Sequence, residues 1–237
     1  MIPSTLVDKL AILSSDLSAA ERENLKLLLS MAAGGFLAGH AQHSTDEVLE
    51  SGLRTAQRTL PALHGGIRAE YTTGVVFRGK TPFISPADLR ALDEESRAHR
   101  DRAVRFHDHY VASGAPVARQ LSVSQAIADF LAPLVGPILP TYRANHLYYD
   151  APGLGIDPHV DKDEFSLNVL TMLEHEPSDR TSELILFPPD QDAIHVQLQP
   201  GESLIFFADS VTHQRTRTVE GETVRLVSFG YKTIEGS

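Results

Sequence analysis

The chain of 237 residues contains no cysteine and no tryptophan. The absence of cysteine excludes a disulfide framework, a thiolate zinc or iron–sulfur site, and a cysteine nucleophile. No stretch approaches the roughly 18 consecutive apolar residues that a membrane-spanning helix needs. The first residues lack a basic segment followed by a long apolar run, so we expect no signal peptide and a cytoplasmic protein without membrane partners.

Positive charge is also scarce, with 21 Lys and Arg against 31 Asp and Glu, for a net charge of −10. The densest basic cluster is Arg215-Thr216-Arg217, which is too short to follow a phosphate backbone. We therefore expect no nucleic-acid partner, because that binding requires clustered basic residues. A hydrophobic content of 42% is enough for one sizeable core, so the whole chain, 1–237, is expected to form a single domain.

The first part of the chain, residues 1–136, has mainly helical patterns and is expected to support the core and form a lid. Residues 3–60 read as helical, with a capping box from Ser18 to Glu21. A β-branched and aromatic run predicts a strand over 71–77. Further helices are predicted over 86–111, after Ser85 and Pro86, and over 122–134.

Short strands dominate from residue 137 to residue 237. The predicted strands cover 139–149, 165–173, 182–188, 194–199, 202–207, 211–218 and 223–232, separated by turn sequences such as Pro200-Gly201. Strands at this spacing without intervening helices favour a jelly roll over a parallel sheet. The predicted fold is mixed α+β, a cupin-like double-stranded β-helix barrel with a helical N-terminal portion packed on it.

His159 and Asp161 stand two residues apart in a segment that reads as extended. Side chains at this spacing point to the same face of a strand, so the imidazole and the carboxylate converge. One nitrogen and one oxygen ligand suit a borderline divalent metal but do not complete its site.

Three histidines downstream could supply a third ligand. His175 lies at a strand end, and His195 lies on the polar face of a strand. His213 follows the apolar run Leu204–Phe207 and a turn, which suits a ligand that reaches the first pair from a barrel rim. His159, Asp161 and His213 would form a two-histidine, one-carboxylate facial set with open positions, as expected for a non-haem Fe(II) oxygenase.

Residues 142–231 resemble the Fe(II)/2-oxoglutarate-dependent dioxygenases. Tyr149-Asp-Ala-Pro-Gly153 is similar to the family's Tyr-x-x-x-Gly segment before its His-x-Asp pair, and Ser182–Leu186 resembles the strand after that pair. Pro200–Phe207 resembles its Pro-Gly turn and apolar strand before the distal histidine. The 52 residues from Asp161 to His213 are an ordinary spacing for the family.

The resemblance implies Fe(II), 2-oxoglutarate and dioxygen as cofactor and co-substrates, with ascorbate as a reductant. It also implies a basic residue after the distal histidine that binds the far carboxylate of 2-oxoglutarate. Arg225, 12 residues after His213, is the expected anchor, with Thr223 on the same face. The family's commonest spacing is nearer ten residues, which leaves Arg217 as a rival. Tyr149 is a further co-substrate contact, with core packing as the alternative.

Strand alternation offers additional interior candidates. If His213 points into the barrel, Arg215 and Arg217 are expected to follow it, with 2-oxoglutarate and a substrate carboxylate as their anionic partners. His107-Asp108-His109 is a competing His-x-His pair, but it falls in the predicted helix, where residues two apart diverge. Roles for His146 and Asn168 stay open at this point.

The resemblance implies hydroxylation of an unactivated C–H bond, with an amino acid or a carboxylate-bearing metabolite as the preferred substrate. A peptide or protein side chain is an alternative substrate, and demethylation, desaturation or ring closure are alternative outcomes. A cupin-like isomerase or hydrolase using Zn(II) or Mn(II) without 2-oxoglutarate is a different class. A non-enzymatic β-sandwich binding module is the least favoured reading. Halogenation is disfavoured because Asp161 fills the position that halogenating relatives leave for chloride.

Overall fold

The computed structural model describes residues 15–18, 21, 71, 73–161, 165–176, 182–188 and 191–234. The helical segments from residue 86 onward are α4 (Pro86–His99), a 3-10 turn (Arg100–Arg102), α5 (Pro116–Ser122) and α6 (Gln125–Val135). The strands are β1 (Val75–Lys80), β2 (Val104–Phe106), β3 (His109–Ser113), β4 (Ile138–Tyr149), β5 (Ile156–His159), β6 (Leu167–Glu176), β7 (Leu184–Phe187), β8 (Ile194–Val196), β9 (Glu202–Phe207), β10 (Thr212–Arg215) and β11 (Thr223–Thr233).

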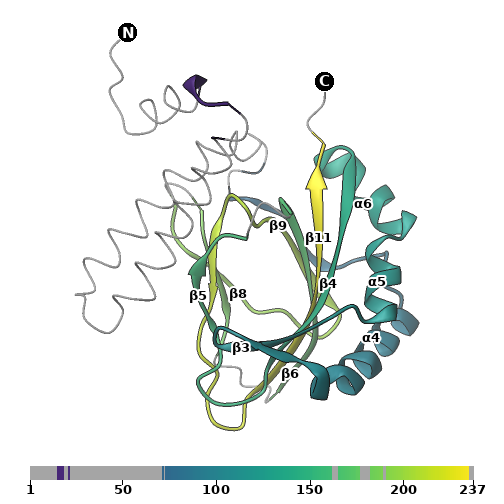
Figure 1. Ribbon diagram of the computed structural model, residues 1–237, viewed down its shortest axis with the longest axis vertical. Helices are drawn as coiled ribbons and strands as arrows, with labels where there is room; N and C mark the ends of the chain where they lie inside the picture. Colours follow the sequence, from purple (N-terminus) through teal and green to yellow (C-terminus); the bar gives the residue numbers. More distant parts are fainter. Residues whose placement is uncertain are drawn as a thin grey trace, which may run out of the picture.

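These strands form two antiparallel sheets that face each other as the walls of a barrel (Figure 1). The larger sheet has seven strands in the order β1-β9-β6-β11-β4-β3-β2, and the smaller has four in the order β5-β10-β7-β8. Helices α4, α5 and α6 cover the outer side of the larger sheet (Figure 1). This is the mixed α+β, double-stranded β-helix architecture that the strand pattern predicted.

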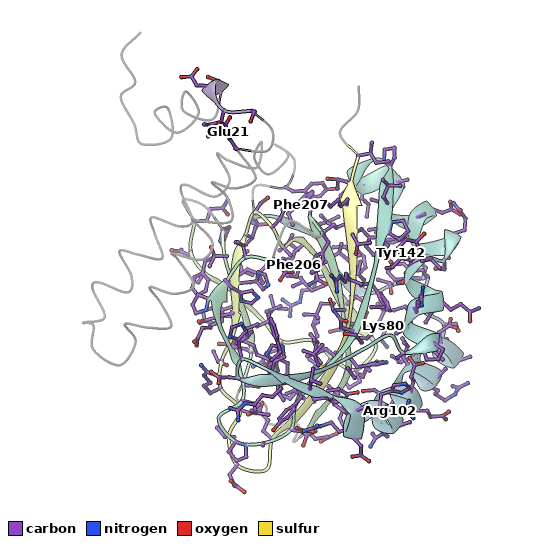
Figure 2. The ribbon with its side chains drawn as sticks, viewed as in Figure 1. Glu21, Lys80, Arg102, Tyr142, Phe206 and Phe207 are labelled. Atoms are coloured by element: carbon purple, nitrogen blue, oxygen red, sulfur yellow. The ribbon has the colours of Figure 1, made fainter. Side chains whose placement is uncertain are left out.

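The larger sheet has a separate hydrophobic core on each face. On β11, Val224 and Leu226 belong to the cluster inside the barrel, whereas Val227 and Phe229 belong to the cluster against the helices. On β9, Phe206 lies inside the barrel (Figure 2), and its neighbour Phe207 packs in the outer cluster. Because side chains alternate along a strand, these two clusters define which face of every strand reaches the interior.

Helix α5 depends on a carboxylate from α4 for its start. Its N-cap residue, Ala115, has no side-chain oxygen to cap the helix. Instead, buried Glu95 accepts hydrogen bonds from the backbone N–H groups of Val117 (2.6 Å) and Ala118 (2.9 Å). Its Oε2 also lies 3.0 Å from Nε2 of His146, on the outer face of β4. Glu95 therefore joins two helices to the sheet, and His146 has a structural partner outside the barrel.

A second buried carboxylate, Glu222, ties together the loops at one end of the barrel. It accepts hydrogen bonds from the backbone N–H groups of Ser182 and Val219, both at 3.0 Å, and lies 2.8 Å from Nε2 of His175. Burial opposes ionisation of this carboxyl, but the hydrogen bonds from Ser182, Val219 and His175 outweigh it and lower the pKa of Glu222 to about 2. The ionised form is therefore the one that the fold stabilises.

Most predicted strands are confirmed to within a few residues, but the helix predicted over 86–111 is wrong in its second half. Helix α4 ends at His99, and β2 and β3 form a hairpin that pairs with β4. The hairpin turns at His107, which has a positive φ of 51°, and at Asp108. The helix predicted over 122–134 is confirmed as α6, and α5, which precedes it, was not predicted.

Three strands of the larger sheet, β1, β2 and β3, come from the part of the chain before residue 137. Strand β1 overlaps the strand predicted over 71–77, whereas β2 and β3 were not predicted. The helices predicted over 3–60 fall almost wholly outside the described residues. The capping box is confirmed, because the backbone N–H of Glu21 donates to Ser18 Oγ and that of Ser18 donates to Glu21 Oε2. Among the described residues, no helix is long and apolar enough to cross a membrane.

Replacing Glu95 with alanine should lower the free energy of unfolding by about 3 kcal/mol, because two backbone N–H groups and His146 lose a charged acceptor. Chemical denaturation would measure this loss. Glu94→Ala is the matched control, since Glu94 is the preceding residue of the same helix and is exposed. Equal stabilities for the two variants would contradict the capping role.

Glu222 predicts a specific acid sensitivity. Its folded-state pKa of about 2 lies below the ordinary value of 4.5, so its contribution is complete above about pH 4.5 and is lost as the pH falls towards 2. Glu222→Gln should lower stability at neutral pH by roughly 2 kcal/mol and flatten the loss below pH 4.5. Urea unfolding across this pH range tests it, and an unchanged acid limb would refute it.

Candidate metal centre

The pairing of β10 with β5 assembles the centre. Its register places His213 directly opposite His159, and the two imidazole ring centroids are 4.3 Å apart. Asp161 follows β5, and its backbone N–H donates to the carbonyl of Ala208 in the turn before β10 (2.8 Å). Gly155 permits the close approach of these segments, because a Cβ there would lie 2.8 Å from the carbonyl oxygen of Arg215.

The three predicted ligands converge. One ligand atom from each of His159, Asp161 and His213 lies within 4.8 Å of the others, and Asp161 Oδ1 is 3.6 Å from His159 Nε2 and 3.7 Å from His213 Nε2. Each imidazole ring is oriented by a contact between its Nδ1 atom and a backbone carbonyl oxygen. Nδ1 of His159 lies 2.8 Å from the carbonyl oxygen of Asp157, and Nδ1 of His213 lies 3.0 Å from that of Val211. These contacts turn both Nε2 atoms towards the carboxylate.

The local electrostatics also suit a cation. Burial, with His159 nearby, lowers the pKa of His213 to about 4, so its imidazole is neutral at physiological pH. Burial opposes ionisation of Asp161, but His213, His159 and a hydrogen bond from Asn168 outweigh it and hold the pKa of Asp161 below its usual value. A neutral imidazole and a carboxylate are the forms that bind divalent metals.

Arg225, the expected 2-oxoglutarate anchor, faces away from the barrel interior. Its Nη2 donates to Asp93 of α4 (2.6 Å) and its Nε to Glu174 of β6 (2.5 Å). Thr223 shares the outer face of β11 by alternation. The prediction failed because β11 is apolar on both faces, so its sequence does not show which face is interior. The guanidinium of Arg225 is instead paired with two carboxylates beneath α4.

Of the two arginines expected to follow His213 into the barrel, Arg215 does so and Arg217 does not. The side chain of Arg217 is 41% exposed and pairs with Asp108 and Asp157. Arg215 is only 5% exposed, and it lines a small cavity with apolar walls that include Leu170, Met172, Leu184 and Leu226. The prediction from alternation is therefore correct for Arg215, the last residue of β10, and wrong for Arg217, which lies beyond the strand.

Arg215 is incompletely satisfied among the described residues. Its Nη2 donates to Ser182 Oγ (3.1 Å), which in turn donates to Glu222, and its buried Nε has no hydrogen-bond partner. Burial lowers the pKa of this guanidinium, although the charge of Glu222 opposes the shift. An unpaired N–H on a buried cation calls for an acceptor.

Tyr149 lies inside the barrel beneath Arg215, whose guanidinium carbon is 5.2 Å from the centroid of its ring. Burial raises the pKa of the Tyr149 phenol to about 12, with Arg215 and Asp161 both acting on it electrostatically. The tyrosine therefore stays protonated and lies within the electrostatic reach of both the metal ligands and the buried cation.

His109 is an interior residue that the sequence reasoning missed. It stacks on the ring of Tyr149, with ring centroids 5.2 Å apart and 16° between the planes. Burial, and then His159, lower its pKa to about 4. The helix predicted over 86–111 would turn His107 and His109 to different faces, whereas His109 begins strand β3. Alternation along the β2–β3 hairpin would have placed His109 on the barrel face. His175 and His195, the other candidate third ligands, contact Glu222 and Glu183 instead.

No family model and no curated protein sequence matches the chain. Solved structures do match it. The α-ketoglutarate-dependent epimerase SnoN from nogalamycin biosynthesis superposes with a TM-score of 0.58 at 18% identity, over 70% of this chain and 80% of that one.

A Trichoplax adhaerens prolyl hydroxylase, solved with a hypoxia inducible factor peptide, gives a TM-score of 0.56 at 15% identity over 81% of this chain and 95% of that one. HygX from Streptomyces hygroscopicus, solved with nickel, 2-oxoglutarate and hygromycin B, gives 0.52 at 13% identity over 68% and 83%. The chain therefore has the double-stranded β-helix fold found in Fe(II)/2-oxoglutarate-dependent oxygenases.

Proposed function

We propose that the protein is a non-haem iron oxygenase that uses 2-oxoglutarate, with His159, Asp161 and His213 holding Fe(II). Two imidazoles and one carboxylate on one side of a cation leave the other coordination positions open. Such a donor set fits an iron that must also bind a co-substrate and dioxygen. The fold and the convergence of these three side chains both support the proposal.

The observation that carries the 2-oxoglutarate assignment is the position of Arg215. It lies two residues after His213 on the same interior face, so the two Cα atoms are roughly 6.5 Å apart. A dicarboxylate bound to the metal at one end would direct its other carboxylate towards this guanidinium. The free Nε and the apolar walls around Arg215 suit an anionic group on a short methylene chain.

Arg215 therefore takes the role first expected of Arg225. Tyr149 supports the same site, since its ring lies against the guanidinium and keeps Arg215 on the interior side. Arg217 and Thr223 have no part in this assignment. Nη2 of Arg215 donates to Ser182 Oγ, which in turn donates to Glu222. This leaves the Nε–H of the guanidinium for the ligand.

Bound iron and 2-oxoglutarate would supply the oxidising power, with dioxygen as the oxidant and succinate and carbon dioxide as products. The residues of this chain contribute three metal ligands, a carboxylate anchor and a water-poor interior. The reaction that we propose is hydroxylation of an unactivated C–H bond, and Asp161 leaves no ligand position for the chloride of a halogenase.

We propose that the substrate is a small molecule, and we favour an amino acid or a carboxylate-bearing metabolite. The small-molecule systems of SnoN and HygX support this class, and the Trichoplax enzyme with its peptide supports a peptide as the alternative. Because SnoN is an epimerase, outcomes other than hydroxylation are alternatives for this chain. A turnover screen that measures succinate, with amino acids in one arm and peptides in the other, separates these classes.

An anaerobic titration with Fe(II) and 2-oxoglutarate tests the proposed function. The protein with both components should develop a visible charge-transfer absorption that neither component gives alone. A folded protein that binds Fe(II) without this absorption would instead support a cupin-like isomerase or hydrolase that does not use 2-oxoglutarate.

The two arginines predict opposite phenotypes. Arg215→Met should weaken 2-oxoglutarate binding roughly 30-fold or more, because a charged partner of a buried carboxylate is removed. Its unfolding free energy should stay level or rise, since a poorly paired buried cation is lost. Charge-transfer titration and denaturation measure the two effects.

Arg225→Met is the matched control. It should leave 2-oxoglutarate affinity within about twofold while lowering stability by about 2 kcal/mol, because Asp93 and Glu174 lose their partner. Loss of 2-oxoglutarate affinity in Arg225→Met with normal affinity in Arg215→Met would refute the anchor assignment.

A further inference from the structure

Two polar side chains interrupt the apolar interior of the larger sheet next to the metal centre. On β6, Asn168 precedes the interior residues Leu170 and Met172, and on β11, Ser228 follows the interior residue Leu226. Asn168 and Ser228 are each 7% exposed. Polar groups that are buried in an apolar wall need hydrogen-bond partners, so their contacts indicate their role.

These residues form a chain of hydrogen bonds that ends on the metal-binding carboxylate. Ser228 Oγ donates to Asn168 Oδ1 (2.9 Å), and Asn168 Nδ2 donates to Asp161 Oδ2 (3.1 Å). Because an ionised carboxylate only accepts, the amide nitrogen must face Asp161, and the amide oxygen is left for the Ser228 hydroxyl. The two contacts therefore agree on one amide orientation.

The two oxygens of Asp161 consequently have different surroundings. Oδ2 is tied to Asn168, whereas Oδ1 faces Nε2 of His159 and His213 at 3.6 Å and 3.7 Å. Both histidines are oriented by backbone carbonyls, which any residue in those positions would provide. Asp161 is the ligand that a polar side chain, Asn168, orients by a hydrogen bond.

We propose that Asn168, itself oriented by Ser228, is a positioning residue that holds Asp161 so that a single oxygen ligates the metal. With Oδ2 engaged, the carboxylate cannot rotate to chelate the metal through both oxygens. One coordination position is thereby kept for other ligands. Residues that orient metal ligands in this way contribute strongly to metal affinity. The inference rests on the proposed function only in taking the triad as a metal site.

Co(II) binding to the chelator-treated full-length protein tests this role without 2-oxoglutarate or turnover. Asn168→Ala should raise the Co(II) dissociation constant roughly 10- to 100-fold. It should also change the ligand-field absorption spectrum, because the freed carboxylate can bind through both oxygens. Ser228→Ala should show a smaller rise, since the amide remains but loses the contact that orients it.

Thr171→Ala is the matched control. Thr171 is a fully buried polar residue of the same strand, but its hydroxyl bonds to Ser203 (2.7 Å) and not towards the triad. This variant should bind Co(II) within twofold of the parent. A comparable loss in Thr171→Ala would overturn the inference by attributing the effect to general damage.

A folded Asn168→Ala with the parental dissociation constant and spectrum would also overturn it. If that variant does not fold, Ser228→Ala decides, and parental Co(II) binding by folded Ser228→Ala overturns the proposal. A parent that binds Co(II) but not 2-oxoglutarate would contradict the proposed function and leave this comparison valid. A parent that does not bind Co(II) would overturn both.

Discussion

The antiparallel pairing of β5 with β10 is the interaction on which the metal centre depends. Its register sets His213 opposite His159, and the bond from Asp161 to Ala208 fixes the third ligand beside them. A shift of one residue would turn one histidine away from the other, because side chains alternate across a strand. Backbone hydrogen bonds between segments some fifty residues apart thus decide whether a site forms.

The barrel interior adds a small number of charged or polar groups to an otherwise apolar space. Arg215 lies over the ring of Tyr149, and a hydrogen-bond chain runs from Ser228 through Asn168 to Asp161. In low dielectric, each such group interacts strongly with a bound ion or carboxylate and is costly to leave unpaired. The outer, helix-covered face carries a separate set of ion pairs, including Arg225 with Asp93 and Glu174.

The sequence was sufficient for the barrel and for the triad, because both follow from local patterns. The two-residue spacing at the end of β5 brings His159 and Asp161 together, and the apolar run and turn before His213 mark a strand that returns to them. Arg225 was misassigned because β11 is a central strand with apolar residues on both faces, so alternation gives no inside or outside. Its partners Asp93 and Glu174 are distant in sequence, as is β4, whose Tyr149 stacks on His109. Those relations depend on strand order, which local patterns do not contain.

A crystal structure of the protein with Mn(II) and 2-oxoglutarate, grown without oxygen, tests the central claim most directly. We predict one metal bound by His159, Asp161 and His213, with the far carboxylate of 2-oxoglutarate on Arg215. A metal held by other residues, or a 2-oxoglutarate carboxylate bound away from Arg215, would contradict the account.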